Sequence, residues 1–201
     1  MDDPALPAAE REAALRGLER ISAWPGQRLS VLEALERLLG KPGPRLRLIE
    51  VGAGSGHLSR WLDRELKLQG FRVEVFPTDR VSVPGVGRMD ALKDALPEAD
   101  IYFSNLMLHH LDDADLSGML QAQCKASRLG FVHLDLHRHP LHYYGASALI
   151  RAAGLPKINL SDGLRSIQQG YTSGELLALA PQGSRVRWHF PFRWALSWQH
   201  P

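Results

Sequence analysis

The chain contains 201 residues, of which 44% are hydrophobic and 23% are charged. Both fractions are close to globular averages, so a disordered tail, a collagen-like fibre and a membrane bundle are excluded. The formal net charge is only +2, and the arginines are scattered along the chain. Because a nucleic-acid footprint clusters on one face, this distribution gives no indication of nucleic-acid binding.

No run of apolar residues is long enough to span a membrane, and the acidic start, Met-Asp-Asp, lacks the basic region of a signal peptide. The single cysteine, Cys124, excludes an internal disulfide framework and a cysteine-based zinc site. We therefore expect a soluble cytoplasmic protein without stable membrane insertion. Its length predicts one domain.

Two helices are predicted before the first strand. Apolar residues between positions 14 and 21 recur at helical spacing, and a Trp-Pro-Gly sequence at 24–26 interrupts them. Ser30 and Glu33 have the spacing of a capping box, which predicts a second helix from Ser30 to Leu39 that stops at Gly40. We expect residues 1–44 to form an N-terminal helical cap.

From residue 45 onward, predicted strands and helices alternate, which is typical of an α/β domain with a Rossmann-like, doubly wound and mostly parallel sheet. A short helix is predicted over 172–179 because Thr172 and Glu175 form a second capping box. Two closing strands, joined through Pro191, predict an antiparallel C-terminal edge. We expect residues 45–201 to form one structural unit. Strands are predicted over 46–51, 71–76, 100–106, 130–136, 185–190 and 192–198, and the other helices over 57–69, 111–128 and 141–153.

A glycine-rich turn, EVGAGSG at residues 50–56, follows the first predicted strand and enters a predicted helix. This is the context of a nucleotide-binding loop, whose glycines let the backbone approach a ligand. A dinucleotide fingerprint would need a glycine where His57 stands, and the Gly-Lys-Ser/Thr of a P-loop is absent. The loop therefore indicates a nucleoside ligand that lacks phosphates.

Motifs in consecutive order resemble those of the class I S-adenosylmethionine-dependent methyltransferases. Residues 50–56 resemble motif I, Asp79 ends the second strand, Asp90 follows the third, and residues 99–111, ADIYFSNLMLHHL, resemble the motif at the fourth. The resemblance implies S-adenosyl-L-methionine as cofactor, with Asp79 at the ribose hydroxyls and Asp90 near the adenine. The implied cofactor-binding residues are Glu50, Gly52, Ala53, Gly54, Gly56, Asp79, Arg80, Asp90, Ala91, Asn105 and Leu106.

Outer motifs narrow this resemblance. Residues 15–21, 135–139, 162–172 and 191–193 resemble bacterial methyltransferases encoded beside type III polyketide synthases, a group similar to the ubiquinone and menaquinone methyltransferases. The resemblance implies a small phenolic, aromatic or polyketide-like acceptor and a role in secondary metabolism. It leaves O-methylation and C-methylation open.

The sequence departs from the family between Asp79 and Asp90. Residues 81–87 contain Pro84, Gly85 and Gly87, which exclude the helix usually found between the second and third strands. We expect a more open adenine side, or one covered by a partner subunit, which makes a homodimer reasonable. Asp90 can equally be the N-cap of a helix over 91–95.

Six of the nine histidines lie between positions 109 and 142. His109 and His110 follow the strand predicted over 100–106 and His137 follows the strand predicted over 130–136, and ligands of open α/β sheets bind at such carboxyl ends. A neutral imidazole can take a phenolic proton, so we nominate His110, then His109 and His137, as the catalytic base. His133, inside a strand, is expected to be a core residue. The residues nominated for acceptor binding are Arg138, Tyr143, Arg165, Gln168 and Tyr171.

Three other functions compete with this interpretation. Asp135, His137 and His139 alternate as metal ligands can, but Pro140 interrupts the geometry and no H-E-x-x-H set is present, so no metal is expected. DNA base methylation would need an Asn/Asp-Pro-Pro-Tyr-like run where residues 105–108 are NLML. The runner-up is a non-catalytic S-adenosylmethionine-binding or partner-binding module, which the short 79–90 segment favours, whereas the intact glycines and Asp79 favour an enzyme.

Overall fold

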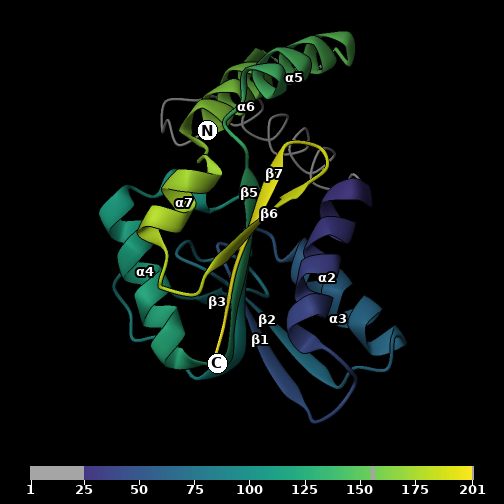
Figure 1. Ribbon diagram of the computed structural model, residues 1–201. Helices are drawn as coiled ribbons and strands as arrows, with labels where there is room; N and C mark the ends of the chain where they lie inside the picture. Colours follow the sequence, from purple (N-terminus) through teal and green to yellow (C-terminus); the bar gives the residue numbers. More distant parts are fainter. Residues whose placement is uncertain (1–24, 155–156, 201) are drawn as a thin grey trace.

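The computed structural model describes residues 25–154 and 157–200. A seven-stranded sheet has the strand order β3-β2-β1-β4-β5-β7-β6 (Figure 1). The first five strands run parallel, and β7 lies antiparallel between β5 and β6. The predicted mostly parallel sheet with an antiparallel C-terminal edge is therefore confirmed. The strands are β1 (Leu46–Val51), β2 (Val73–Asp79), β3 (Gly87–Arg88), β4 (Ala99–Asn105), β5 (Ser127–Leu136), β6 (Arg185–His189) and β7 (Arg193–Gln199).

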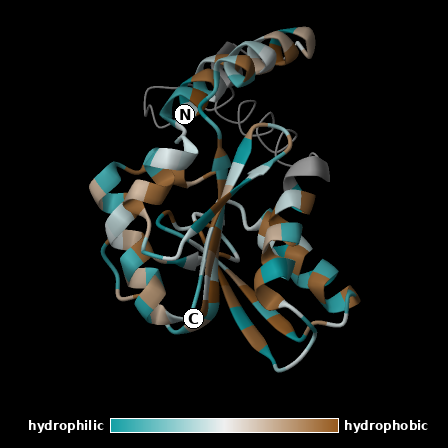
Figure 2. Ribbon diagram, in the orientation of Figure 1, coloured by the Kyte–Doolittle hydropathy of each residue, from teal (hydrophilic) through white to brown (hydrophobic). Residues whose placement is uncertain are grey.

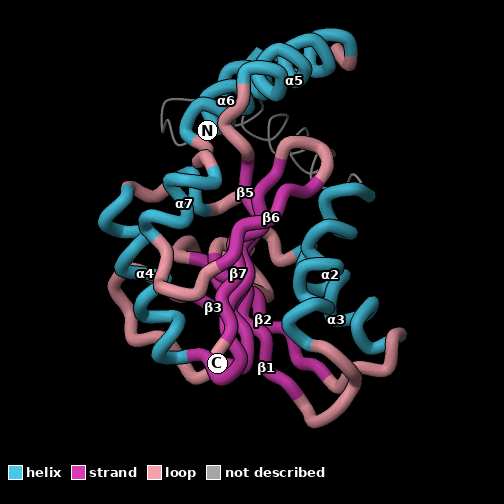
Figure 3. The backbone as a smooth tube through the Cα atoms, in the orientation of Figure 1, coloured by secondary structure: helices cyan, strands magenta, loops and turns pink. Residues whose placement is uncertain are grey.

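Helices cover both faces of the sheet. In Figure 1, α2 and α3 lie on one face, α4 and α7 on the other, and α5 and α6 lie beyond the end of β5. Figure 3 shows the same layers by element type. No helix of the described ranges is long and apolar enough to cross a bilayer. The helices are α2 (Pro25–Leu39), α3 (His57–Leu68), the 3-10 helix η1 (Leu108–His110), α4 (Asp113–Ala126), α5 (Pro140–Ala152), α6 (Lys157–Gln169) and α7 (Ser173–Leu179).

The core has two apolar layers, one on each side of the sheet. Leu35 of α2 and Leu62 of α3 are fully buried in the first, and Leu116 and Leu120 of α4 in the second. Because side chains alternate along a strand, Ile101 of β4 belongs to the first layer and the next residue, Tyr102, belongs to the second. Figure 2 shows the hydrophobic residues running along the strands.

The N-terminal prediction needs one correction. Helix α2 begins at Pro25, because proline suits the first turn of a helix, where its missing N–H leaves no bond unmade. Ser30 lies inside α2 with a relative exposure of 7%, so the capping box predicted at Ser30 and Glu33 is wrong. The first predicted helix, over 14–21, lies outside the described residues. The division at residue 44 stays a prediction, and α2 packs on the sheet in the same core layer as β1.

Strand β2 also differs from its prediction, since it runs from Val73 to Asp79 rather than over 71–76. Its pairing with β1 continues to Thr78. Pro77 does not end the strand, because β3 pairs only with Thr78 and Asp79 and the missing N–H costs no bond to that neighbour. The capping box of Thr172 and Glu175 at α7 is confirmed.

Helix α6 was not predicted. Its sequence, KINLSDGLRSIQQ, carries a central glycine and several polar residues that favour turns, which lowers its helix propensity. Ile167 is buried, and α6 packs against α5 and η1. Tertiary packing therefore supplies what local propensity lacks.

The segment between β2 and β3 contains no helix, as predicted, and β3 has only two residues. The alternative helix over 91–95 is not formed either. Asp90 instead accepts a hydrogen bond from the backbone of Leu92 at 3.1 Å, which closes a turn.

Candidate active site

The carboxyl ends of β1, β2, β4 and β5 meet at one edge of the sheet, because these strands are parallel. The glycine loop follows β1 there. Gly52, Gly54 and Gly56 have φ values of 69°, 54° and 70°, which L side chains rarely adopt. A Cβ on Gly52 would come within 2.7 Å of Met107 Cγ, whereas a Cβ on Gly54 would meet nothing within 4 Å. Gly52 therefore permits close packing beneath the loop, and Gly54 borders open space.

Asp79 joins the glycine loop to the end of β2. Its Oδ2 accepts a hydrogen bond from the N–H of Gly54 at 2.8 Å, and its Oδ1 accepts one from Val81 at 2.9 Å. The N–H of Ala53 also donates to the carbonyl of Thr78 at 2.9 Å. The carboxylate thus lies directly beside the loop, although the two are 25 residues apart in sequence.

Glu50 lies beneath the loop and is only 2% exposed. The hydroxyl of Ser59, in the first turn of α3, donates to its carboxylate. Burial raises the pKa of Glu50 to about 7, against the lowering effect of the hydrogen bonds from Ser59. Glu50 therefore ties β1 to α3 and holds the loop from below.

The predicted adenine side is built around Asp90. The N–H of Met89 donates to the carbonyl of Asp79 at 2.9 Å, which places Asp90 near Asp79. The Asp90 side chain is 30% exposed, with Lys93 Nζ at 3.8 Å. Ala91 is buried and Arg80 is exposed.

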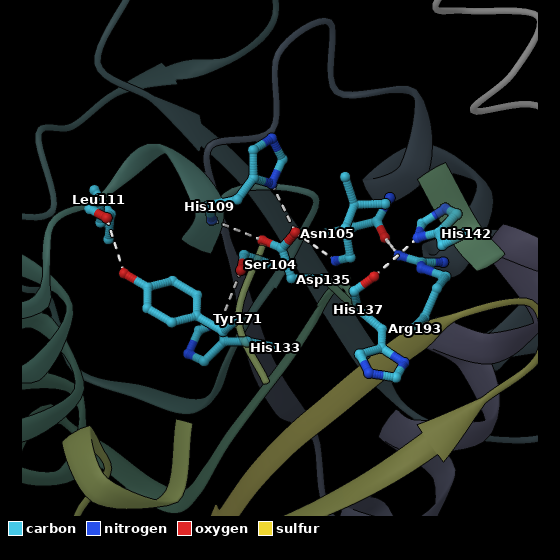
Figure 4. Close-up of polar contacts among 11 residues, drawn as sticks. Ser104, Asn105, His109, Leu111, His133, Asp135, His137, His142, Tyr171 and Arg193 are labelled. Carbon is cyan, nitrogen blue, oxygen red and sulfur yellow. Dashed lines mark hydrogen bonds and ion pairs between the residues drawn. The ribbon is translucent and has the colours of Figure 1, made fainter. Parts of the chain in front are cut away.

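His109, which follows β4, and Asp135, near the carboxyl end of β5, form a buried pair (Figure 4). His109 Nδ1 lies 2.6 Å from Asp135 Oδ1, and the His109 backbone N–H donates to Oδ2 at 3.1 Å. Burial alone would raise the pKa of Asp135, but the hydrogen bonds from His109 and Leu136 bring it below its usual value. The His110 side chain is exposed, and its ring centroid lies 4.1 Å from that of His109.

His133 is a core residue, as predicted. Its Nδ1 lies 2.8 Å from Ser104 Oγ and its Nε2 lies 2.7 Å from Gln123 Oε1. Burial lowers its pKa to about 3, against a smaller opposite effect of Asp135. His133 is therefore neutral, with both ring nitrogens engaged.

His137, His139 and His142 gather around Phe192 at the end of β5. The rings of His139 and His142 stack on Phe192 with centroids at 5.5 and 5.2 Å. Burial, then the neighbouring His139 and His142, lower the pKa of His137. Two of these three imidazoles bond the local backbone: His139 Nδ1 accepts from Leu141 N at 3.1 Å, and His142 Nδ1 bonds the His137 carbonyl at 2.9 Å. Across the described ranges, no three His, Cys, Asp or Glu residues are arranged to hold a metal ion.

Asn105 ends β4, and Leu106 follows it. The Asn105 side-chain oxygen accepts a hydrogen bond from Arg193, which is only 2% exposed. Burial lowers the pKa of Arg193 to about 10, so the guanidinium is still charged at neutral pH. Leu106 has a φ of 57°, an uncommon value for a residue other than glycine.

The residues nominated for acceptor binding do not form one cluster. Tyr171 pairs with His137 in a β-bridge, and its hydroxyl donates to the carbonyl of Leu111 at 2.9 Å. Arg138 lies next to this bridge and bonds Glu175 of α7. Tyr143 is half-buried on α5, and Arg165 and Gln168 are exposed on α6.

Two features of the site were missed from the sequence, where Asp135 was considered only as a metal ligand. One is its pairing with His109, and the other is the ring of Phe192 among the histidines. The signal for Asp135 was present, since a single acid in the apolar run FVHLDL at 131–136 needs a buried partner.

No protein-family model matches the sequence, and no curated protein matches it. Solved structures do match. Human N-acetylserotonin methyltransferase in complex with S-adenosylmethionine superposes with a TM-score of 0.57 and 17% identity, over 94% of this chain and 55% of that one. The plantazolicin methyltransferase BpumL in complex with S-adenosylhomocysteine has a TM-score of 0.70 and 11% identity, over 100% of this chain and 92% of that one. The chain has the fold of the S-adenosylmethionine-dependent methyltransferases.

This methyltransferase fold is also found in a methyltransferase from Aquifex aeolicus, with a TM-score of 0.59 and 15% identity over 92% of this chain and 97% of that one. The chain thus spans about half of the human enzyme (55%) and nearly all of BpumL (92%) and of the Aquifex aeolicus enzyme (97%). The likeness establishes the fold and leaves the acceptor open.

Proposed function

We propose that this protein is an S-adenosylmethionine-dependent methyltransferase that acts on a small aromatic, phenolic or polyketide-like acceptor. The observation that carries the proposal is the 2.8 Å bond between Gly54 N and Asp79 Oδ2, at the edge of the sheet where ligands of such folds bind. Neighbours with the same fold were crystallised with S-adenosylmethionine or S-adenosylhomocysteine. These findings support S-adenosyl-L-methionine as the cofactor.

The residues present fit this cofactor. Gly54 borders open space, so its backbone can approach a ligand, and Asp79 offers carboxylate oxygens to ribose hydroxyls. The exposed part of Asp90, next to Asp79, suits the adenine side. When bound, the cofactor supplies an activated methyl group on a sulfonium. The protein then has to align the acceptor with that group, which contributes about 7–11 kcal/mol in well-oriented systems.

A histidine base near the acceptor completes the proposal, and His110, His109 and His137 are its candidates. The base removes the proton of the acceptor hydroxyl, either for O-methylation or to activate a phenol ring for C-methylation. The rings around Phe192 support an aromatic acceptor, because planar rings pack on one another favourably. A homodimer covering the open adenine side also belongs to this proposal.

Calorimetry with S-adenosylmethionine and S-adenosylhomocysteine tests the cofactor. We expect Asp79→Asn to weaken binding about 10- to 100-fold, since hydrogen bonds to charged groups contribute about 1.5–3 kcal/mol. The matched control is Asp63→Asn, because Asp63 pairs with Lys67 on the surface of α3. Circular dichroism checks that both variants fold.

Absence of binding at millimolar cofactor, or equal affinity of Asp79→Asn and wild type, would contradict the proposal. Mass spectrometry after incubation with phenols, quinones and alkylresorcinols then identifies the acceptor. Binding without turnover on any acceptor would favour the non-catalytic module instead. The two-residue β3 and the helix-free segment before it are the features that favour that alternative.

A further inference from the structure

We infer that His109 is the base that takes the acceptor proton and that Asp135 is its positioning residue. The inference rests on the proposed methyl transfer and chooses one among the nominated histidines. Asp135 bonds His109 twice: its Oδ1 lies 2.6 Å from the ring Nδ1, and its Oδ2 accepts a hydrogen bond from the backbone N–H at 3.1 Å. The ring is thereby held in one orientation relative to η1.

The pair also determines which ring nitrogen is free to accept a proton. Asp135 is ionised, and an ionised carboxylate can only accept hydrogen bonds, so Nδ1 of His109 carries the hydrogen. In the neutral ring the lone pair is then on Nε2. Figure 4 shows the second ring nitrogen of His109 on the side away from the Asp135 carboxylate.

The pair lies where the reaction would take place. His109 follows β4, and Asp135 is at the carboxyl end of β5, the strand that pairs with β4 up to Asn105 and Leu134. A Cβ on Gly52 of the glycine loop would lie 2.7 Å from the Cγ of Met107, which is two positions before His109. The pair therefore lies at the same edge of the sheet as the proposed cofactor loop, the edge where ligands of open α/β sheets bind.

The other histidines of this edge are less suited. Both ring nitrogens of His133 are engaged inside the core. His137 Nδ1 is enclosed without a hydrogen-bond partner in the described part of the chain, and two further histidines adjoin its ring. The His110 side chain is exposed, so bulk water competes for its proton.

The proton transfer balances within the residues named. The proton of the acceptor O–H passes to Nε2 of His109, which leaves an imidazolium with hydrogen on both nitrogens. The acceptor oxygen keeps the electron pair of the broken O–H bond and would use it to bond the methyl carbon, while the bond from that carbon to the sulfonium sulfur would break and leave its electron pair on sulfur. Asp135 stabilises the imidazolium without becoming protonated, and the imidazolium later returns its proton to water. A positioned base of this kind contributes about 10²- to 10⁴-fold in rate.

Nitrogen-15 NMR of the histidine rings tests the pair without any turnover. In the wild-type protein, the His109 signals, assigned by their loss in His109→Gln, should show hydrogen on Nδ1 at pH values where the ring is neutral. In Asp135→Asn this preference should be lost. Hydrogen on Nε2 in the wild type, or an unchanged spectrum in Asp135→Asn, would overturn the inference.

Kinetics with an identified acceptor test the base. His109→Gln and Asp135→Asn should lower kcat about 10²- to 10⁴-fold while the cofactor Kd stays within twofold, and His110→Gln should lower kcat less than tenfold. The rate of His109→Gln should rise at alkaline pH, where the phenol ionises by itself, and wild type should lack this rise. His200→Gln is the control, since His200 is exposed at the far end of β7.

The other titratable groups around the pair are His110 on η1, His133 on β5, Tyr171 before α7 and Arg193 on β7.

A wild-type rate in His109→Gln, or an equal loss in His110→Gln, would overturn the assignment. Should Asp135→Asn fail to fold, the His109→Gln profile and the wild-type NMR spectrum still decide the matter. If the wild-type protein binds cofactor but methylates no acceptor, the proposed function is contradicted. The hydrogen-bonded pair of His109 and Asp135 is tested separately by the NMR experiment.

Discussion

His133 of β5 and His109 of η1 both interact with Asp135, yet their surroundings differ. Both ring nitrogens of His133 lie within hydrogen-bond distance of neutral groups, those of Ser104 and Gln123, and burial outweighs the opposite effect of Asp135 and keeps the ring uncharged. His109 faces an ionised carboxylate, which can stabilise a positive charge on the ring. The first histidine therefore supports the core, and the second is the one we infer to be the base.

Burial of His133 makes a prediction about acid stability. Its pKa is about 3 in the folded protein against 6.5 in the unfolded chain, so between pH 6.5 and pH 3 this proton is bound mainly by the unfolded chain. The free energy of unfolding should fall as the pH drops from 6.5 toward 3, by at most about 1.4 kcal/mol per pH unit from this group. Denaturant unfolding of wild type and His133→Gln at several pH values measures the difference.

In His133→Gln this contribution should be absent. Burial also lowers the pKa values of His137, His142 and His189, but these groups remain in the variant and cancel in the comparison. The same pH dependence in both proteins would show that His133 is not the buried neutral group described above.

At the scale of elements, the closing strands depend on one close approach between β5 and β7. Gly130 has a φ of 145°, and a Cβ there would lie 2.0 Å from the carbonyl oxygen of Trp198. Only glycine lets β7 run against β5 at this point. Since β5 also carries His133 and Asp135, this contact holds the strand that supports the candidate site.

Gly130→Ala should therefore destabilise the fold by about 3 kcal/mol or more, because backbone strain and steric overlap add. Gly118→Ala is the matched control, since Gly118 is in α4 and a Cβ there would meet nothing within 4 Å. It should stabilise the protein by about 0.5–1 kcal/mol, as alanine does in helices. Denaturant unfolding of the three proteins compares them, and equal stability of both variants would contradict the close approach.

At the scale of the whole molecule, the α5–α6 pair differs from the rest of the structure. Strands β4 and β5 are buried on both faces. In α5, only Ser147 and Ile150 are buried, and Leu141 and Tyr144 are 65% and 70% exposed. Figure 1 places this pair beyond the end of β5, above the edge that carries the candidate site.

Local stability should follow this difference in burial. Hydrogen exchange, read by mass spectrometry or NMR, should be fastest in α5 and slowest in β4 and β5, because segments with few buried contacts open at low free-energy cost. Protection of α5 equal to that of β5 would contradict the prediction. It would indicate that a second copy of the chain covers the exposed apolar residues of α5.

Much of the fold could be predicted because its signals are local. The bounds of β1, the absence of a helix over 81–87 and the capping box at Thr172 depend on residues a few positions apart. The prediction that Ser30 caps a helix also relied on a local signal, and it was wrong. The spacing of a capping box is present at Ser30 and Glu33, but the helix already begins at Pro25. Helix α6 was missed because it depends on packing against α5 and η1.

By itself, the sequence determined the alternation of strands and helices, the glycine loop after β1 and the antiparallel end of the sheet. Each of these follows from hydrophobic period, turn residues or spacing within a short window. Only the tertiary structure decided that Asp135 bonds His109, 26 positions away, and that Asp79 bonds Gly54, 25 positions away. Such contacts arise because parallel pairing brings the carboxyl ends of distant strands to one edge, and no local pattern specifies which side chains meet there.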